Sequence, residues 1–178
     1  MNTNLIRQMQ NYVAETCIGA SALRNQGDKG LIEASRRFFK KINLPEIPTD
    51  PIRFKAWLDE KTMQLLNDFP TKAQNFGAAR KALNLFLRST VYNIHLNRAH
   101  NLDPLLPILE LPLDSYAAKH LIIKGFGVKK LPRWPGLKSL SEADHNEYQK
   151  AARSLSLDRG LQRVDLDAFF FREDTNSE

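Results

Sequence analysis

The sequence predicts an all-α protein that folds as a single-domain helical bundle. Apolar residues recur at intervals of three and four along most of the chain, Gly, Pro and capping residues separate these stretches, and no segment keeps the alternation of a strand. A chain of 178 residues with 42% apolar content is large enough for one sizeable core. We therefore expect one helical domain over residues 1–171 and a frayed C-terminal tail over residues 172–178.

Composition and charge narrow the functional classes. Cys17 is the single cysteine, which excludes an intrachain disulfide and an all-cysteine metal site. No apolar run reaches the roughly 18 residues of a membrane span, and the N-terminus lacks a secretory signal pattern, so we expect a cytoplasmic protein without a membrane partner. The net charge of +6 and the pI near 9.5 favour approach to a polyanion such as double-stranded DNA. The oligomeric state stays open.

Three helices are expected in the N-terminal part of the chain. Their apolar faces start at Leu5, Leu31 and Phe54. Thr49 or Asp50 is a good cap for the third helix, because Pro51 is tolerated in a first turn that needs no N–H donor. The expected ranges are 4–18, from Gly27 or Gly30 to about Ile42, and from Thr49 or Asp50 to the Phe69-Pro70 stop.

The longest expected helix runs from Asn75 to Arg98, which is roughly 36 Å at 1.5 Å per residue and makes it the central element. Its apolar residues share one arc of the helix, and a polar, mostly cationic stripe occupies the neighbouring arc. The stripe consists of Arg80, Lys81, Asn84, Arg88, Tyr92, His95 and Arg98.

The second half of the chain reads as shorter helices joined by a basic loop. Asp103-Pro104 opens an apolar turn or helix through Leu109, and Asp114 is positioned to cap the helix that follows. Residues 124–138 form a loop with five cations and no acid. Ser141 then caps a helix that ends at Gly160, and residues 164–171 are expected to dock as a short helix.

The order of these segments resembles the helix-hairpin-helix DNA glycosylase superfamily over about a quarter of the chain. The residues that carry the resemblance are Asn75-Phe76-Gly77-Ala78-Ala79-Arg80-Lys81 and Leu111-Pro112-Leu113-Asp114-Ser115-Tyr116. In that family a Pro-x-Asp segment starts a helix, and its aspartate faces the flipped nucleotide. The chain has one glycine where the usual hairpin has two, and its longer spacing is similar to that of some archaeal 8-oxoguanine glycosylases.

This resemblance implies a catalytic role for Asp114, a Schiff-base role for Lys81 and a hairpin role for Gly77. A base-excision enzyme stabilises a cationic sugar as the glycosidic bond breaks, and a nearby carboxylate meets that need. An amine attacks the sugar carbon only when it is deprotonated, which burial and neighbouring cations promote by lowering a lysine pKa. The sequence contains no sign of a cofactor.

Candidate DNA contacts lie on the polar stripe and on the basic loop. Cationic side chains would bind phosphates, and an aromatic ring would stack on an exposed base. These residues are Arg80, Arg88, Lys124, Lys129, Lys130, Arg133 and Trp134. The alternative is a basic connector in which Trp134 fills part of the core.

Structural interpretations stand beside each catalytic one. Asp114 is fully explained as a helix cap, and Lys81 as a solvated surface lysine. His95 and His120 have no cysteine or carboxylate at metal-ligand spacing, so no metal site is expected. Two functions remain: a DNA N-glycosylase or lyase, and a noncatalytic helical module that binds nucleic acid or protein.

Overall fold

The computed structural model describes residues 2–19, 21–26, 30–124 and 131–173, except for the side chains of residue 124 and residues 171–173. Across these residues the chain forms α-helices and short 3₁₀ turns without any strand, which confirms the all-α prediction. None of these helices combines the length and the apolar character that crossing a membrane requires.

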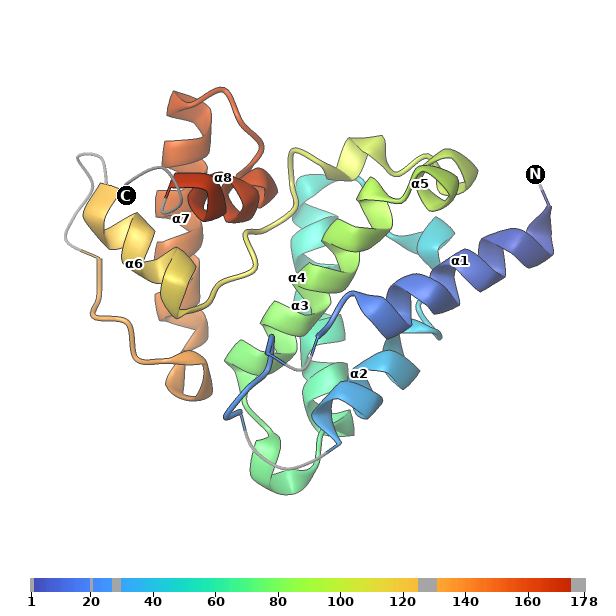
Figure 1. The fold of residues 1–178 in the computed structure, drawn as a ribbon, viewed down its shortest axis with the longest axis horizontal. Helices are drawn as coiled ribbons and strands as arrows, with labels where there is room; N and C mark the ends of the chain where they lie inside the picture. Colours follow the sequence, from blue (N-terminus) through green and yellow to red (C-terminus); the bar gives the residue numbers. More distant parts are fainter. Residues whose placement is uncertain (1, 20, 27–29, 125–130, 174–178) are drawn as a thin grey trace.

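The helices fall into two groups along the chain (Figure 1). The first group contains α1 (Thr3–Thr16), α2 (Leu31–Phe39), α3 (Pro51–Asp68), α4 (Phe76–Tyr92) and α5 (Ile94–His100). The second contains α6 (Ser115–Lys124), α7 (Glu142–Asp158) and α8 (Leu166–Glu173). An irregular segment over residues 101–114, with one 3₁₀ turn at Asp103–Leu105, crosses from the first group to the second.

Several helix ends follow the capping residues that the sequence predicted. Asp50 Oδ1 accepts a hydrogen bond from the Arg53 amide at 2.9 Å, and Ser141 Oγ accepts one from the Asp144 amide at 3.0 Å. Gly160 follows α7 with φ of 64°, the left-handed conformation that glycine adopts without steric cost. The boundaries of α3 and α7 are thus set by local chemistry.

The single long helix predicted from Asn75 to Arg98 is wrong, because the structure divides it at Asn93. This residue has extended backbone angles (φ −78°, ψ 111°), which end α4. Its side-chain oxygen accepts hydrogen bonds from the amides of His95 and Leu96, both at 3.1 Å, and so starts α5. Asparagine is among the best helix caps, and here that local preference overrides a continuous helical pattern.

Two apolar clusters form the core. The larger one joins α1 to α5 and includes Phe39 stacked on Phe86, with ring centroids 4.5 Å apart. The smaller one joins α6, α7 and α8 around Leu121, Tyr148 and Phe170. Helix α4 lies between the two groups, and its residues 77–87 are all buried. The prediction that α4 is the central helix is confirmed, but the first part of its polar stripe faces the protein interior.

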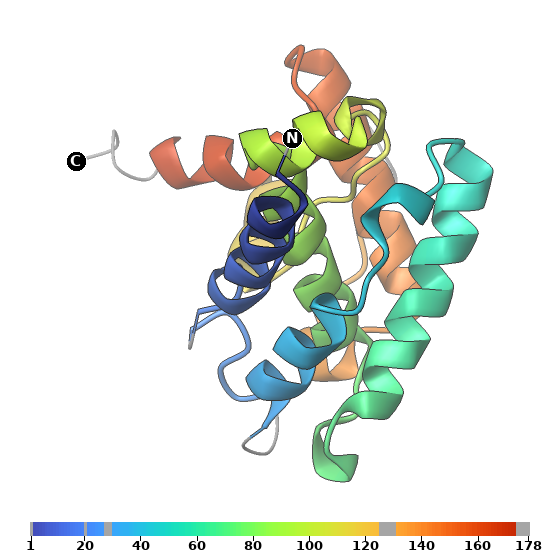
Figure 2. The ribbon, with the colours of Figure 1, turned by 90° about the vertical axis from the view of Figure 1, so that its right-hand side faces the viewer.

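Helices α3 and α4 pack as an antiparallel pair. The chain descends along α3, turns at residues 69–75 and returns upward along α4 (Figure 2). Asn75 closes this connection, because its Oδ1 accepts a hydrogen bond from the Ala78 amide at 2.8 Å and its Nδ2 donates one to the Gln26 carbonyl at 3.2 Å. The first turn of α4 is therefore anchored to the chain that precedes α2.

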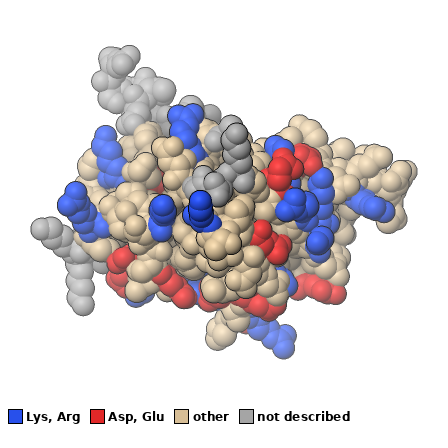
Figure 3. Space-filling view, turned by 90° about the horizontal axis from the view of Figure 1, so that it is seen from below, with Lys and Arg blue, Asp and Glu red and all other residues tan. Residues whose placement is uncertain are grey.

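Charged side chains are unevenly distributed over the face seen from below (Figure 3). Lys and Arg side chains are scattered over its upper and middle parts, whereas most Asp and Glu side chains lie toward its lower edge. An uneven distribution of this kind gives a positive potential over part of the surface.

Candidate functional site

Lys81 and Asp114 lie in direct contact between α4 and the start of α6. The Lys81 ammonium donates a hydrogen bond to Asp114 Oδ2, with 3.1 Å between the nitrogen and the oxygen. The Lys81 side chain is 8% exposed and the Asp114 side chain 31% exposed. Lys81 is therefore a buried lysine held by a carboxylate, and the interpretation of Lys81 as a solvated surface residue is wrong.

Asp114 is fixed by the helix that it opens. Its Oδ1 accepts a hydrogen bond from the Ala117 amide at 2.9 Å, and its backbone carbonyl accepts one from the Ala118 amide at 2.9 Å. The helix dipole and the free amides of the first turn favour a negative charge at this position. Asp114 therefore caps α6 as predicted and also directs its second oxygen at Lys81.

Gly77 lies one turn before Lys81, at the point where α4 meets the 3₁₀ turn Leu137–Ser139. A Cβ atom at residue 77 would lie 2.2 Å from the Leu137 carbonyl oxygen, far closer than real Cβ atoms approach an oxygen. The absence of a side chain lets the two backbones touch. The glycine that the resemblance assigns to a hairpin is thus a close-packing position within the protein.

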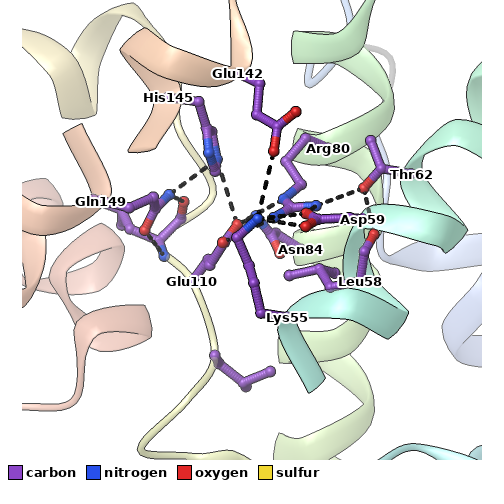
Figure 4. A network of polar contacts seen from close by, with 12 residues as sticks. Lys55, Leu58, Asp59, Thr62, Arg80, Asn84, Glu110, Glu142, His145 and Gln149 are labelled. Atoms are coloured by element: carbon purple, nitrogen blue, oxygen red, sulfur yellow. Dashed lines mark hydrogen bonds and ion pairs between the residues drawn. The ribbon is translucent and has the colours of Figure 1, made fainter. Parts of the chain in front are cut away.

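Arg80 points into a buried polar network (Figure 4), whose residues do not include Lys81 or Asp114. Its Nε and one terminal nitrogen donate to the two oxygens of Glu110 at 2.8 and 3.0 Å. The other terminal nitrogen contacts Asp59 Oδ1 at 2.8 Å and donates to Thr62 Oγ1 at 2.9 Å. The side chain is 1% exposed. The predicted contact between Arg80 and DNA finds no support here, because the guanidinium is enclosed by protein.

The network continues from Glu110 into α7. His145 Nε2 lies 3.4 Å from Glu110 Oε2, and Asn84 Nδ2 donates to the same oxygen at 3.1 Å. Gln149 clamps the backbone of Leu111, because its Nε2 donates to the carbonyl at 2.7 Å and its Oε1 accepts from the amide at 3.1 Å. The network therefore links α3 and α4 to α7 through the crossing segment.

The environment of this network sets its charge state. Burial raises the pKa of Glu110, but the nearby charges of Arg80, His145 and Arg163 outweigh it and bring the pKa to about 2. Burial lowers the pKa of His145 to about 4, against the opposing effect of Glu110. At neutral pH the glutamate is therefore ionised and the imidazole neutral. Gln149 Nε2 lies 3.3 Å from His145 Nε2, the imidazole nitrogen near Glu110.

The other predicted DNA contacts have mixed surroundings. Arg88 is 28% exposed and forms an ion pair with Asp167 of α8. Arg133 is exposed, whereas Trp134 is partly buried. The rings of Trp134 and Tyr148 meet edge to face, with their centroids 5.3 Å apart. Trp134 thus packs against the smaller core, in agreement with the alternative interpretation of the loop. Lys129, Lys130 and the Lys124 side chain lie outside the described residues.

The histidines that the sequence drew attention to lie apart from the Lys81–Asp114 contact. The His120 ring stacks on Phe170 with centroids 4.9 Å apart, and His95 is exposed on α5. In the part of the chain that the structure describes, no three His, Cys, Asp or Glu side chains gather as a metal site would require.

Four pockets of about 300 to 700 Å³ open on the described surface, and Lys81 and Asp114 line none of these four. One of them, between α3 and α7, is lined by Glu110 and several cations and adjoins the buried network. In comparisons with known proteins, no family model, curated protein or solved structure matches this chain.

Proposed function

We propose that this protein is a DNA-binding N-glycosylase with lyase chemistry, in which Lys81 and Asp114 act on a nucleotide flipped out of the duplex. One observation carries the proposal. The two side chains are 33 residues apart in sequence, yet their charged atoms lie 3.1 Å apart with the lysine almost fully buried. The resemblance to the helix-hairpin-helix DNA glycosylases implies such a pair, a lysine beside an aspartate that opens a helix.

The chemistry follows from the protonation of this pair. When Lys81 has transferred its proton to water, its free amine attacks C1′ of the deoxyribose, the base leaves with the electrons of the glycosidic bond, and the leaving base takes a proton from the new ammonium. An ionised Asp114 stabilises the positive charge that develops on the sugar before the new C–N bond is complete.

The surrounding architecture supports the same proposal. An antiparallel helix pair, a glycine at the start of the second helix and an aspartate that opens a later helix occur in the order that the resemblance implies. Arg80 takes a scaffold role here, because its four contacts with Asp59, Thr62 and Glu110 hold the first half of α4 in place. Lys81 then stands on a rigid element, which accurate positioning requires.

DNA binding is assigned to the remaining cationic residues. Exposed Arg133 and partly exposed Arg88 are available at the surface, and the net charge of +6 attracts a polyanion. Phosphate contacts position a protein on DNA without reading its sequence. The proposed contacts are Arg88, Lys124, Lys129, Lys130 and Arg133, with Trp134 beside them.

Release of a damaged base tests the proposal. The protein is incubated with duplexes that each carry one modified base, and the freed base is measured by mass spectrometry. We expect release from at least one duplex, and a loss of 100-fold or more in Asp114→Asn and Lys81→Gln. The matched control is Lys72→Gln, which removes an exposed lysine and should keep full activity. Equal activity of wild type and Asp114→Asn would refute the assignment.

A noncatalytic nucleic-acid-binding module is the second candidate. It is favoured by the fact that both Asp114 oxygens already have protein partners, Lys81 and the Ala117 amide. Such a module would bind DNA with an affinity that falls steeply as salt rises, and Lys81→Gln would lower its stability. Binding of this kind without release of any base would favour the module.

A further inference from the structure

We infer a second binding site, specific for a phosphate monoester, in the pocket between α3 and α7. The pocket has a volume of about 400 Å³, which lies within the range of small-molecule sites. In Figure 2, α3 and α7 lie to the right of α4, whereas α1 lies to its left. Neither Lys81 nor Asp114 lines this pocket, so the inference does not depend on the proposed function.

Two arginines give the pocket a charge that the protein itself does not neutralise. Lys55 pairs with Asp59, and Lys150 pairs with Glu147, with 2.7 Å between nitrogen and oxygen in each case. Lys55 also lies 3.6 Å from a second carboxylate, that of Glu142. Arg153 and Arg163 also line the pocket, and neither has a carboxylate within 4 Å in the described part of the chain. Glu110 reaches the same pocket, but Arg80 compensates its charge.

Arg163 is held in place for binding rather than by a counter-ion. Its Nε donates to the Leu109 carbonyl and one terminal nitrogen to the Ile108 carbonyl, both at 2.9 Å. These bonds fix the plane of the guanidinium, while in the described part of the chain no carboxylate lies within 4 Å of its nitrogens. Burial lowers the pKa of Arg163, and Arg153 lowers it further against the opposing effect of Glu110. A bound anion would relieve this electrostatic cost.

The size of the unpaired charge selects the ligand. A phosphate monoester carries about −1.5 to −2 charges at neutral pH, whereas a carboxylate or an internal phosphodiester of DNA carries about −1. Two arginines that have no carboxylate within 4 Å among the described residues match the dianion. Arg153 offers its planar edge to two phosphate oxygens. Arg163 offers the terminal N–H groups that its bonds to Leu109 and Ile108 leave over.

Apolar side chains also line the pocket and indicate what the phosphate is attached to. Pro51, Phe54 and Ile108 line the pocket together with the cations, and Asn146 adds an amide. Phe54 is only 2% exposed, so a flat ring would pack on exposed Pro51 and partly exposed Ile108 while its phosphate reaches the arginines. The inferred ligand is therefore a nucleoside monophosphate, either free or as the 5′-phosphorylated end of a strand.

Binding is tested by isothermal titration with adenosine 5′-monophosphate, using adenosine and inorganic phosphate for comparison. We expect the nucleotide to bind at least tenfold tighter than adenosine, and Arg153→Gln to weaken it roughly tenfold. Arg37→Gln removes an equally exposed arginine on α2 and should bind like wild type. Arg163→Gln, checked for folding by circular dichroism, should bind more weakly still. Equal binding of nucleotide and nucleoside, or an unchanged affinity in Arg153→Gln, would overturn the site.

Oligonucleotides with and without a 5′-phosphate separate the two sources of the ligand. Tighter binding of the phosphorylated strand, lost in Arg153→Gln, would assign the site to strand ends. A response limited to the free nucleotide would assign it to a small molecule. If neither the nucleotide nor the phosphorylated strand binds, the inference is wrong.

Discussion

Arg80 and Glu110 carry full charges where water does not reach, at 1% and 5% exposure. Removing two charged groups from water is energetically unfavourable, and close contacts and hydrogen bonds within the protein must offset that penalty. Here every Glu110 oxygen and each of the three Arg80 nitrogens has a partner in the network. The pair therefore fixes how α4, the crossing segment and α7 fit together.

A double-mutant cycle measures how strongly the two charges depend on each other. Arg80→Met leaves Glu110 ionised and buried, so we expect a loss of about 3–5 kcal/mol in the free energy of unfolding. Glu110→Gln should cost a similar amount. The double variant should cost clearly less than the sum, because it leaves no isolated charge. Additive losses in urea unfolding would mean that the pair is not coupled.

The neutral state of His145 predicts how stability changes with pH. Its pKa is about 4 in the folded protein, against 6.5 for an ordinary histidine. Because the pKa of His145 is lower in the folded protein than in the unfolded chain, the neutral imidazole contributes its full stabilisation above pH 6.5. This stabilisation is lost as the pH falls toward 4, since the unfolded chain binds the proton first. The expected loss is on the order of 3 kcal/mol.

Urea unfolding at several pH values tests this in wild type, His145→Gln and His95→Gln. His145→Gln should show a shallower fall between pH 6.5 and 4, whereas the exposed His95 variant should follow wild type. Glu110, whose folded pKa is about 2, adds its own loss from about pH 4.5 downward. Identical slopes in all three proteins would place the neutral imidazole in doubt.

At the scale of single elements, the start of α4 depends on a glycine. Alanine normally stabilises a helix by about 1 kcal/mol over glycine. At residue 77 the added methyl would lie 2.2 Å from the Leu137 carbonyl oxygen, and overpacking of this kind typically costs about 1–3 kcal/mol. Because a backbone atom blocks the space, we expect Gly77→Ala to be destabilising.

Gly19→Ala is the matched control, because a Cβ at residue 19 meets no atom within 4 Å. It should change the free energy of unfolding by less than about 0.5 kcal/mol. Thermal or urea unfolding of both variants decides the point. A Gly77→Ala protein as stable as wild type would show that α4 and the 3₁₀ turn at Leu137–Ser139 are less closely packed than described.

Much of the helix pattern could be predicted from local signals. Asp50, Ser141 and Gly160 act as the sequence indicated, because caps depend on neighbouring residues only. The break at Asn93 was missed, although Asn is itself a capping residue. Helical periodicity continues from α4 into α5, and periodicity alone does not show where the axis changes direction.

At the scale of the whole molecule, the polar stripe of α4 was the hardest feature to interpret. A row of charged residues on one helix face usually faces water, but here α3, the crossing segment and α7 cover the first part of the row. The residues that join Arg80 in this network lie on three other segments: Glu110, Asp59 and His145. No spacing in the sequence links these residues to Arg80. The sequence alone does not show which distant acid pairs with a given cation, because the two residues come together only when the chain folds.

The candidate site was predicted better than the network around it. Asp114 was expected to open a helix, and it does. The resemblance gave Lys81 and Asp114 roles in one reaction, and the fold brings the two side chains into contact. Arg80 was assigned to the DNA surface together with Lys81, although the two side chains contact different residues. Neighbours on a helix are separated by about 100° around its axis, so adjacent cations reach different environments.

Reductive trapping tests the central claim most directly. The protein is mixed with duplexes carrying damaged bases or an abasic site, treated with sodium borohydride, and analysed by peptide mass spectrometry. We predict a covalent protein–DNA adduct located on Lys81, absent in Lys81→Gln and retained in Lys72→Gln. An adduct that persists in Lys81→Gln, or none with any of these duplexes, would contradict the assignment of Lys81 and Asp114 as the reacting pair.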